Sequence, residues 1–375
     1  MRLFRRHRLL TNISLVLIVL VLARTAELSQ DTTRSAALII IALMCLQTFA
    51  FAAPDHSRGV VSPRRLRQAL TIRAIGFASI CLLALASYAL QRIFILHDWR
   101  VPSNSSWLLL PLLFSVLLDA IYSRPYVDEY WTIGKALTTR RGIRTIIARR
   151  DFGSCFIKVF FYPLMFIYIE RYIDLFHQYW LPKSWSAVEI YESLAVYHLL
   201  VDLIFGACGY ALSLQVLGNR IRSVNPYFSG WVVTMICYSP FAEILGQILV
   251  FEWRKDWLVL TQDWPIAQAI WLMLIACCFV VYAWATVELG PRFSNMSYRG
   301  IVNSGPYRLM KHPAYVSKVA SSWLITVPFI PMSGWNFAGQ QCFFLSIWSL
   351  IYYLRAKYEE KHLMQYSEYR TYALR

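Results

Sequence analysis

Charged side chains are scarce in this sequence. They make up 15% of its 375 residues, whereas hydrophobic residues make up 58%. A typical soluble domain carries about 25% charged residues. This deficit excludes an ordinary soluble domain, and we expect a membrane protein with several transmembrane segments.

Several sequence signatures are also missing. No C-x-x-C pair occurs among the eight cysteines, and no H-E-x-x-H spacing occurs among the seven histidines. Glycine-rich phosphate-binding or dinucleotide-binding motifs, internal repeats and low-complexity tracts are absent as well. We therefore expect neither a disulfide framework nor a metal site. The cysteines lie in or beside apolar segments, which is typical of small buried hydrophobic residues.

Long apolar runs are abundant. A hydrocarbon core about 30 Å thick needs about 20 apolar residues per helix. By this measure we predict an all-α fold, a polytopic membrane helical bundle of about eight to ten transmembrane helices. The predicted spans are residues 9–23, 35–53, 74–90, 106–122, 152–169, 193–217, 229–250, 267–286, 316–331 and 338–354.

The net charge of +16 is not gathered in one stripe. Instead, loops rich in lysine and arginine alternate with loops that have few, so we expect no nucleic-acid partner. The positive-inside rule then places both termini in the cytoplasm. The basic segment 123–151 is predicted to touch anionic lipid headgroups, or alternatively to be a solvated charge run. Residues 1–30 resemble a signal peptide, but we favour a retained first helix because many spans follow.

Ionisable residues occur within some predicted spans, namely Asp119, Lys158, His198, Asp202 and Glu243. Such residues are costly at membrane depth. His198 and Asp202 are four residues apart and share a helix face. Pro240 is expected to kink the helix that carries Glu243. These residues either line a polar cavity for a substrate headgroup or satisfy one another as packing contacts, and the second reading is the default.

A polar stretch that begins at Val287 ends in the sequence "NSGPYRLMKHPAY", residues 303–315. Proline is favoured in the first turn of a helix, because its missing N–H would have no partner there. The sequence therefore predicts a helix that starts at Pro313. The amides and the positive end of that helix would face the space beside His312, which suits an anionic group.

A second polar element, "YYLRAKYEEKHLMQYSEYRTY", follows the last apolar run. We predict an amphipathic cytoplasmic helix. At 100° per residue, one stripe of this helix carries Arg355, Glu359, His362, Tyr366 and Tyr369. Glu360 points away from that stripe. Paired carboxylates at a membrane surface can accept hydrogen bonds from ribose hydroxyls or from an ammonium group.

The chain resembles a known family in the order of its motifs: L-G-x-x-F-S (289–294), G-P-Y-R-x-x-K-H-P-x-Y (305–315), one helical hairpin, R-x-x-x-E-E-x-x-L (355–363) and E-Y-x-x-Y (368–372). This is the isoprenylcysteine carboxyl methyltransferase and phospholipid N-methyltransferase family of integral membrane enzymes. The resemblance covers about residues 287–375. It implies S-adenosylmethionine as cofactor, held at the cytoplasmic mouth of the final hairpin, and a lipid or lipid-linked methyl acceptor.

The resemblance also implies roles for particular residues. The implied cofactor-binding residues are Gly305, Tyr307, His312, Pro313, Tyr315, Glu359 and Glu360. The implied catalytic residues are Arg355, which would orient an anionic acceptor, and Glu359 or His362, which would act as a base for an amine or hydroxyl. Two positions depart from the family pattern: Lys311 replaces the usual arginine and Ser317 the usual glycine.

Two other functions stay open. Membrane sterol and steroid reductases that use NADPH share a similar turn, but their tails carry an Arg-Asp and Lys-Tyr-Gly type of ending, and this chain has a glutamate pair. A transporter or scaffold with a degenerate tail is the other alternative. We divide the chain into an N-terminal transmembrane region of unknown role, residues 1–225, and a methyltransferase-like region, residues 226–375, with its motif core at 287–375.

Overall fold

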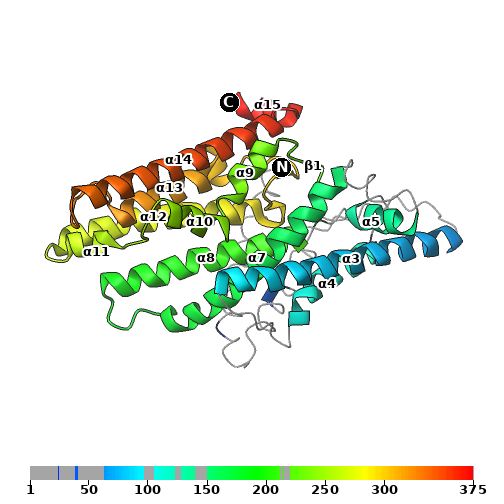
Figure 1. Ribbon diagram of the computed structural model, residues 1–375, viewed down its shortest axis with the longest axis horizontal. Coiled ribbons are helices and arrows are strands. Elements are labelled where there is room, and N and C mark those ends of the chain that lie inside the picture. Colours follow the sequence, from blue (N-terminus) through cyan, green and yellow to red (C-terminus); the bar gives the residue numbers. More distant parts are fainter. Residues whose placement is uncertain are drawn as a thin grey trace. The chain divides into compact units, whose positions relative to one another are not determined.

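The computed structural model describes residues 24, 39–40, 63–96, 105–122, 128–139, 150–211, 213 and 220–374. These residues are mostly α-helical, which confirms the predicted helical class. The chain divides into two compact units. Unit 1 comprises Met1–Ile173, Leu203–Val224 and Gly290–Gly300, and unit 2 comprises Asp174–Asp202, Asn225–Leu289 and Ile301–Arg375. Figure 1 shows the elements in the colours of the sequence.

Four described helices are long and apolar enough to cross a membrane, judged by length and composition. They are α3 (Pro63–Leu96), α7 (Arg150–Tyr179), α8 (Ala187–Ala211) and α12 (Pro265–Leu289). Each contains most or all of one predicted span. The predicted span 9–23 lies outside the described residues, as does nearly all of 35–53.

The prediction of one span over 229–250 is wrong. The structure has two short helices there, α9 (Phe228–Met235) and α10 (Phe241–Ile248), with a turn between them. Pro240 has no N–H to continue a helix, and Cys237 N–H bonds instead to the Thr234 carbonyl, at 3.1 Å. A helix of eight residues rises only about 12 Å, too little to cross a bilayer.

In unit 1, α3 packs against α5 (Glu129–Thr138) at a glycine contact. A Cβ atom placed on Gly76 would lie 1.8 Å from the Tyr130 carbonyl oxygen, and one placed on Gly134 would lie 1.8 Å from the Ile72 carbonyl oxygen. The two helix backbones therefore approach so closely that each position accepts only glycine. Small residues allow the same close approach between helices in membranes.

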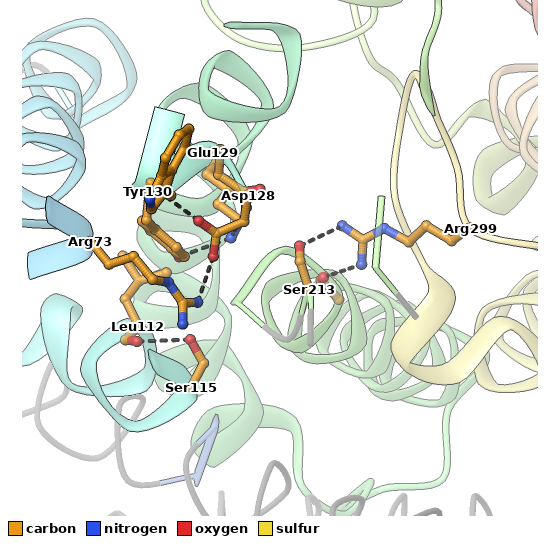
Figure 2. A network of polar contacts seen from close by, with 11 residues as sticks. Arg73, Leu112, Ser115, Asp128, Glu129, Tyr130, Ser213 and Arg299 are labelled. Carbon is orange, nitrogen blue, oxygen red and sulfur yellow. Dashed lines mark hydrogen bonds and ion pairs between the residues drawn. The ribbon is translucent and has the colours of Figure 1, made fainter. Parts of the chain in front are cut away.

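Several buried charges in unit 1 form ion pairs, as Figure 2 shows around Asp128. The Arg73 guanidinium lies 2.5 Å from the Asp128 carboxylate, which also accepts a 2.7 Å bond from Trp131 N–H at the start of α5. Lys158 of α7 pairs with Glu129 and donates to the Tyr130 hydroxyl at 2.8 Å. The ionisable residue predicted at position 158 is therefore satisfied by its neighbours.

Two further helical pieces and a small sheet belong to unit 1. Helix α4 (Leu109–Tyr122) follows the 3₁₀ turn η2 (Ser105–Leu108). Strand β1 (Ser223–Val224) pairs antiparallel with β2 (Ser297–Tyr298). Beside β2, buried Arg299 donates to the Gly209 carbonyl at 2.5 Å and to Ser213, a pair drawn in Figure 2. This contact joins the loop 290–300 to the end of α8.

Unit 2 is built around α12, α13 (Pro313–Thr326) and α14 (Trp335–Leu363), which pack together as neighbours. Helices α13 and α14 form a hairpin, as predicted for the motif region. The buried face of α14 includes Phe344 and Trp348, and Phe251 stacks on Phe344 with ring centroids 3.8 Å apart. The short helix α11 (Asp256–Thr261) buries Trp257 against α12 and α13.

The predicted continuous helix through Tyr369 is wrong. Helix α14 ends at Leu363, and a separate helix α15 (Ser367–Ala373) follows at its end in Figure 1. The Tyr366 N–H bonds to the Leu363 carbonyl at 2.9 Å, and the extended backbone of Tyr366 interrupts the helical ladder. Tyr366 and Tyr369 therefore do not lie on the α14 stripe that the periodicity predicted.

Candidate functional site

The predicted helix start at Pro313 is confirmed. His312 is the N-cap residue of α13, and Pro313 occupies the first helical position. The first turn of such a helix presents backbone N–H groups that have no acceptor within the helix. Ser317 stands where the family that this chain resembles usually has glycine. It is buried and donates to the Pro313 carbonyl at 2.7 Å, so its hydroxyl is hydrogen-bonded within α13.

The structure brings the glutamate pair to the start of α13. His312 Nε2 lies 3.2 Å from Glu360 Oε1, and the Tyr315 hydroxyl donates to Glu359 Oε2 at 2.8 Å. The His312 and Tyr315 rings stack with centroids 5.3 Å apart. We call these four residues the carboxylate cluster. Both glutamates reach α13, although helical periodicity separates their directions by about 100°.

The two carboxylates of the cluster differ in environment. His312 lowers the pKa of Glu360 to about 2, chiefly through its hydrogen bond, and Lys357 contributes through a 3.2 Å bond to the other oxygen. Glu360 is therefore ionised at neutral pH. The Glu359 side chain is 39% exposed. Its Oε1 atom accepts no hydrogen bond from the described residues, so this carboxylate keeps an open acceptor.

Arg355 lies on the same helix, one turn before Glu359. It is 5% exposed, and its guanidinium carbon lies 4.7 Å from the centroid of the Tyr315 ring and 5.4 Å from that of Tyr238. The Tyr352 ring centroid is 5.8 Å away. Cation–π attraction to three rings holds the guanidinium in place. A buried cation thus adjoins the carboxylate cluster through Tyr315.

The 3₁₀ turn η4 (Gly305–Arg308) carries two predicted cofactor-binding residues. Gly305 has a φ of +55°, and a Cβ atom placed there would lie 3.0 Å from Glu288 Oε2. Ser304 donates to the same Glu288 carboxylate. Burial raises the pKa of the Tyr307 phenol, and the negative charge of Glu359 adds to this effect. Tyr307 therefore lies within electrostatic reach of the carboxylate cluster.

His362 contacts an aromatic ring outside the carboxylate cluster. It is 2% exposed and packs edge-on against the Tyr366 ring, with centroids 6.1 Å apart. By contrast, His312, Pro313, Tyr315, Glu359, Glu360 and Arg355 gather around the start of α13.

The described ionisable side chains of the other predicted spans have partners as well. Asp202 accepts bonds from the Tyr282 hydroxyl at 2.9 Å and from the Thr286 hydroxyl at 2.6 Å. The His198 ring stacks on that of Phe279. Both residues thus lie on one face of α8, as their spacing predicted, and the structure shows that this face contacts α12. Ser239 donates to Glu243. The Asp119 side chain lies outside the described residues. These contacts fit the packing interpretation.

Other residues of the group were not predicted from sequence. Tyr352 precedes Arg355 by three residues on one helix, so helical spacing could have identified it. Glu288 is a carboxylate at the end of an apolar run, a signal that was also available. Tyr238 is 117 residues from Arg355, and no local pattern connects the two.

No group of three or more histidine, cysteine, aspartate or glutamate side chains within the described ranges could hold a metal ion. The carboxylate cluster, the first turn of α13 and η4 offer acceptors for hydrogen-bond donors and free amides for a negatively charged group. Comparison of the chain with protein-family models, with curated protein sequences and with solved structures gives no match.

Proposed function

We propose that this protein is an integral membrane methyltransferase that uses S-adenosylmethionine. In this proposal it transfers the methyl group to a lipid or lipid-linked carboxyl, amine or hydroxyl at the cytoplasmic face, where both termini lie. The observation that carries the proposal is the carboxylate cluster. Residues about 45 positions apart meet at the start of α13, in the pairs His312 with Glu360 and Tyr315 with Glu359.

The chemistry of the cluster matches the polar parts of this cofactor. Glu359 Oε1 is an open acceptor for a ribose hydroxyl or for the ammonium of the methionyl group. The first-turn amides of α13 and the helix dipole favour the methionyl carboxylate. His312 and Tyr315 hold the two carboxylates in position, and Gly305 and Tyr307 line the neighbouring turn. When bound, the cofactor supplies a methyl group that its sulfonium charge has already activated.

The protein then has to align the acceptor and exclude water. Arg355, held among tyrosine rings next to Tyr315, would orient an anionic acceptor. A carboxylate acceptor needs no base, whereas an amine or hydroxyl does. Glu359 and His362 are the candidates for that role, and Glu359 is the better placed because its side chain is partly exposed, whereas His362 is buried.

Calorimetry on detergent-purified protein tests the proposal. We expect S-adenosylmethionine and S-adenosylhomocysteine to bind to the wild type. The variants His312→Ala and Glu360→Ala should bind about 10- to 100-fold more weakly, as expected for loss of a charge-assisted hydrogen bond. Lys357→Ala is the matched control. It removes the exposed partner of Glu360 but keeps the carboxylate and His312, so its affinity should stay close to that of the wild type.

The alternatives give different results in the same experiment. Binding of NADPH alone would point to a reductase, and a folded protein that binds none of the three ligands would point to a transporter or scaffold. Where the methyl donor binds, transfer of label from S-adenosylmethionine into a total lipid extract identifies the acceptor class. Arg355→Lys should then lower turnover much more than it lowers cofactor affinity, because lysine keeps the charge but not the planar guanidinium.

A further inference from the structure

Tyr369 has a buried hydroxyl group without a partner. The residue is 4% exposed, and its hydroxyl oxygen has no hydrogen-bond partner among the described residues. Tyrosine hydroxyls usually find a partner when they are buried. An unpaired hydroxyl costs free energy in the unliganded protein. Its position therefore calls for an explanation other than stability.

Helix α15 holds this hydroxyl in place. The Tyr369 N–H bonds to the Tyr366 carbonyl at 3.1 Å in the first turn of the helix. One turn later, the Tyr372 hydroxyl donates to the Tyr307 carbonyl in η4 at 2.7 Å. The Tyr369 and Tyr372 rings pack together with centroids 5.6 Å apart. Helix α15 is thus anchored to the turn that carries Gly305 and Tyr307.

Tyr369 belongs to α15, which directly follows the glutamate-bearing end of α14 and is bonded to η4 through Tyr372. Burial raises the pKa of Tyr369, and the negative charges of Glu360 and Glu359 raise it further. The hydroxyl therefore keeps its proton at neutral pH and can both donate and accept a hydrogen bond. The partly exposed Glu359 carboxylate bonds to Tyr315 through Oε2, and its Oε1 accepts no hydrogen bond from the described residues. Two unused polar atoms, a phenol oxygen and a carboxylate oxygen, thus belong to the same part of unit 2.

We propose that Tyr369 is a ligand-binding residue whose hydroxyl bonds to the adenosyl or methionyl part of the bound cofactor, while Glu359 Oε1 accepts a hydrogen from the same group. This inference rests on the proposed function. A group that gives a hydrogen to the carboxylate and also bonds to the phenol must offer at least two polar contacts. The ribose diol and the methionyl ammonium share that chemistry.

The variant Tyr369→Phe separates a binding role from a structural one. It removes only an unpaired hydroxyl, so the unliganded protein should melt at the same temperature or higher. Affinity for S-adenosylhomocysteine should fall about 3- to 10-fold, the value of one ordinary hydrogen bond. Tyr372→Phe is the matched control from the same helix. It loses the bond to the Tyr307 carbonyl and should melt at a lower temperature.

Ligand analogues then identify the group that Tyr369 contacts. S-adenosylhomocysteine analogues without a ribose hydroxyl or without the amino group are titrated into the wild type and Tyr369→Phe. The analogue that binds equally well to both proteins lacks the partner of Tyr369. Equal affinity of both proteins for S-adenosylhomocysteine itself would overturn this inference alone. A wild type that does not bind S-adenosylhomocysteine would overturn the proposed function and this inference together.

Discussion

Gly305 allows a quantitative test of the turn beside the carboxylate cluster, through the substitution Gly305→Ala. Its φ of +55° lies in the left-handed region, which costs a residue with a Cβ atom about 1–2 kcal/mol. The new Cβ would lie 3.0 Å from Glu288 Oε2 and 3.1 Å from Trp284 Nε1. Such contacts are shorter than the optimum of about 3.5–4.0 Å, and Glu288 is held by its bond from Ser304.

The free-energy terms can be added. Crowding adds about 1 kcal/mol or more to the backbone term. Alanine also reduces the conformational entropy of the unfolded chain, which offsets about 0.4–1 kcal/mol of this destabilisation. We therefore expect Gly305→Ala to lower the free energy of unfolding by about 2 kcal/mol. Thermal unfolding in detergent measures the change, and titration with S-adenosylhomocysteine should show weaker binding because η4 shifts.

Gly339→Ala is the control with the same chemical change. Gly339 lies inside α14, and beyond the backbone of its own helix and its two chain neighbours no atom lies within 4 Å of an added Cβ. Alanine in a helix interior is more stable than glycine by about 0.5–1 kcal/mol. This variant should therefore melt at the wild-type temperature or above. A Gly305→Ala protein that melts as high as Gly339→Ala would refute the left-handed turn at position 305.

Two further predictions concern charged groups. Lys158→Met leaves Glu129 buried without its cation and should destabilise the protein by about 3–5 kcal/mol, which a lower melting temperature would show. The double variant Lys158→Met with Glu129→Gln should recover much of the lost melting temperature. The pKa of Glu360 is lowered from 4.5 to about 2 in the folded state, so its stabilising contribution is complete above pH 4.5 and is lost as the pH falls toward 2. The difference in melting temperature between wild type and Glu360→Gln should shrink as the pH falls from 4.5 toward 2; a difference that stays the same over this range would contradict this assignment.

Some features of the candidate site follow from local sequence. The helix start at Pro313 was predictable because proline sterics act within one turn. The shared face of His198 and Asp202 followed from a spacing of four residues. The end of α14 at Leu363 was not predictable in this way, because neither proline nor glycine marks the turn before Ser367. The helical spacing of the polar residues continues unchanged through this turn, so it does not indicate where the helix ends.

The sequence by itself determined the helical class and the four long apolar helices, because hydrophobicity and length are properties of each segment alone. It also indicated which polar segments stand beside the apolar ones. Only the tertiary structure decided which side chains meet. Glu359 contacts Tyr315, which is 44 positions away in the sequence, and Glu360 contacts His312, which is 48 positions away. Contacts of that range depend on how the helices pack, since hairpin geometry and not local periodicity brings both carboxylates to one helix end.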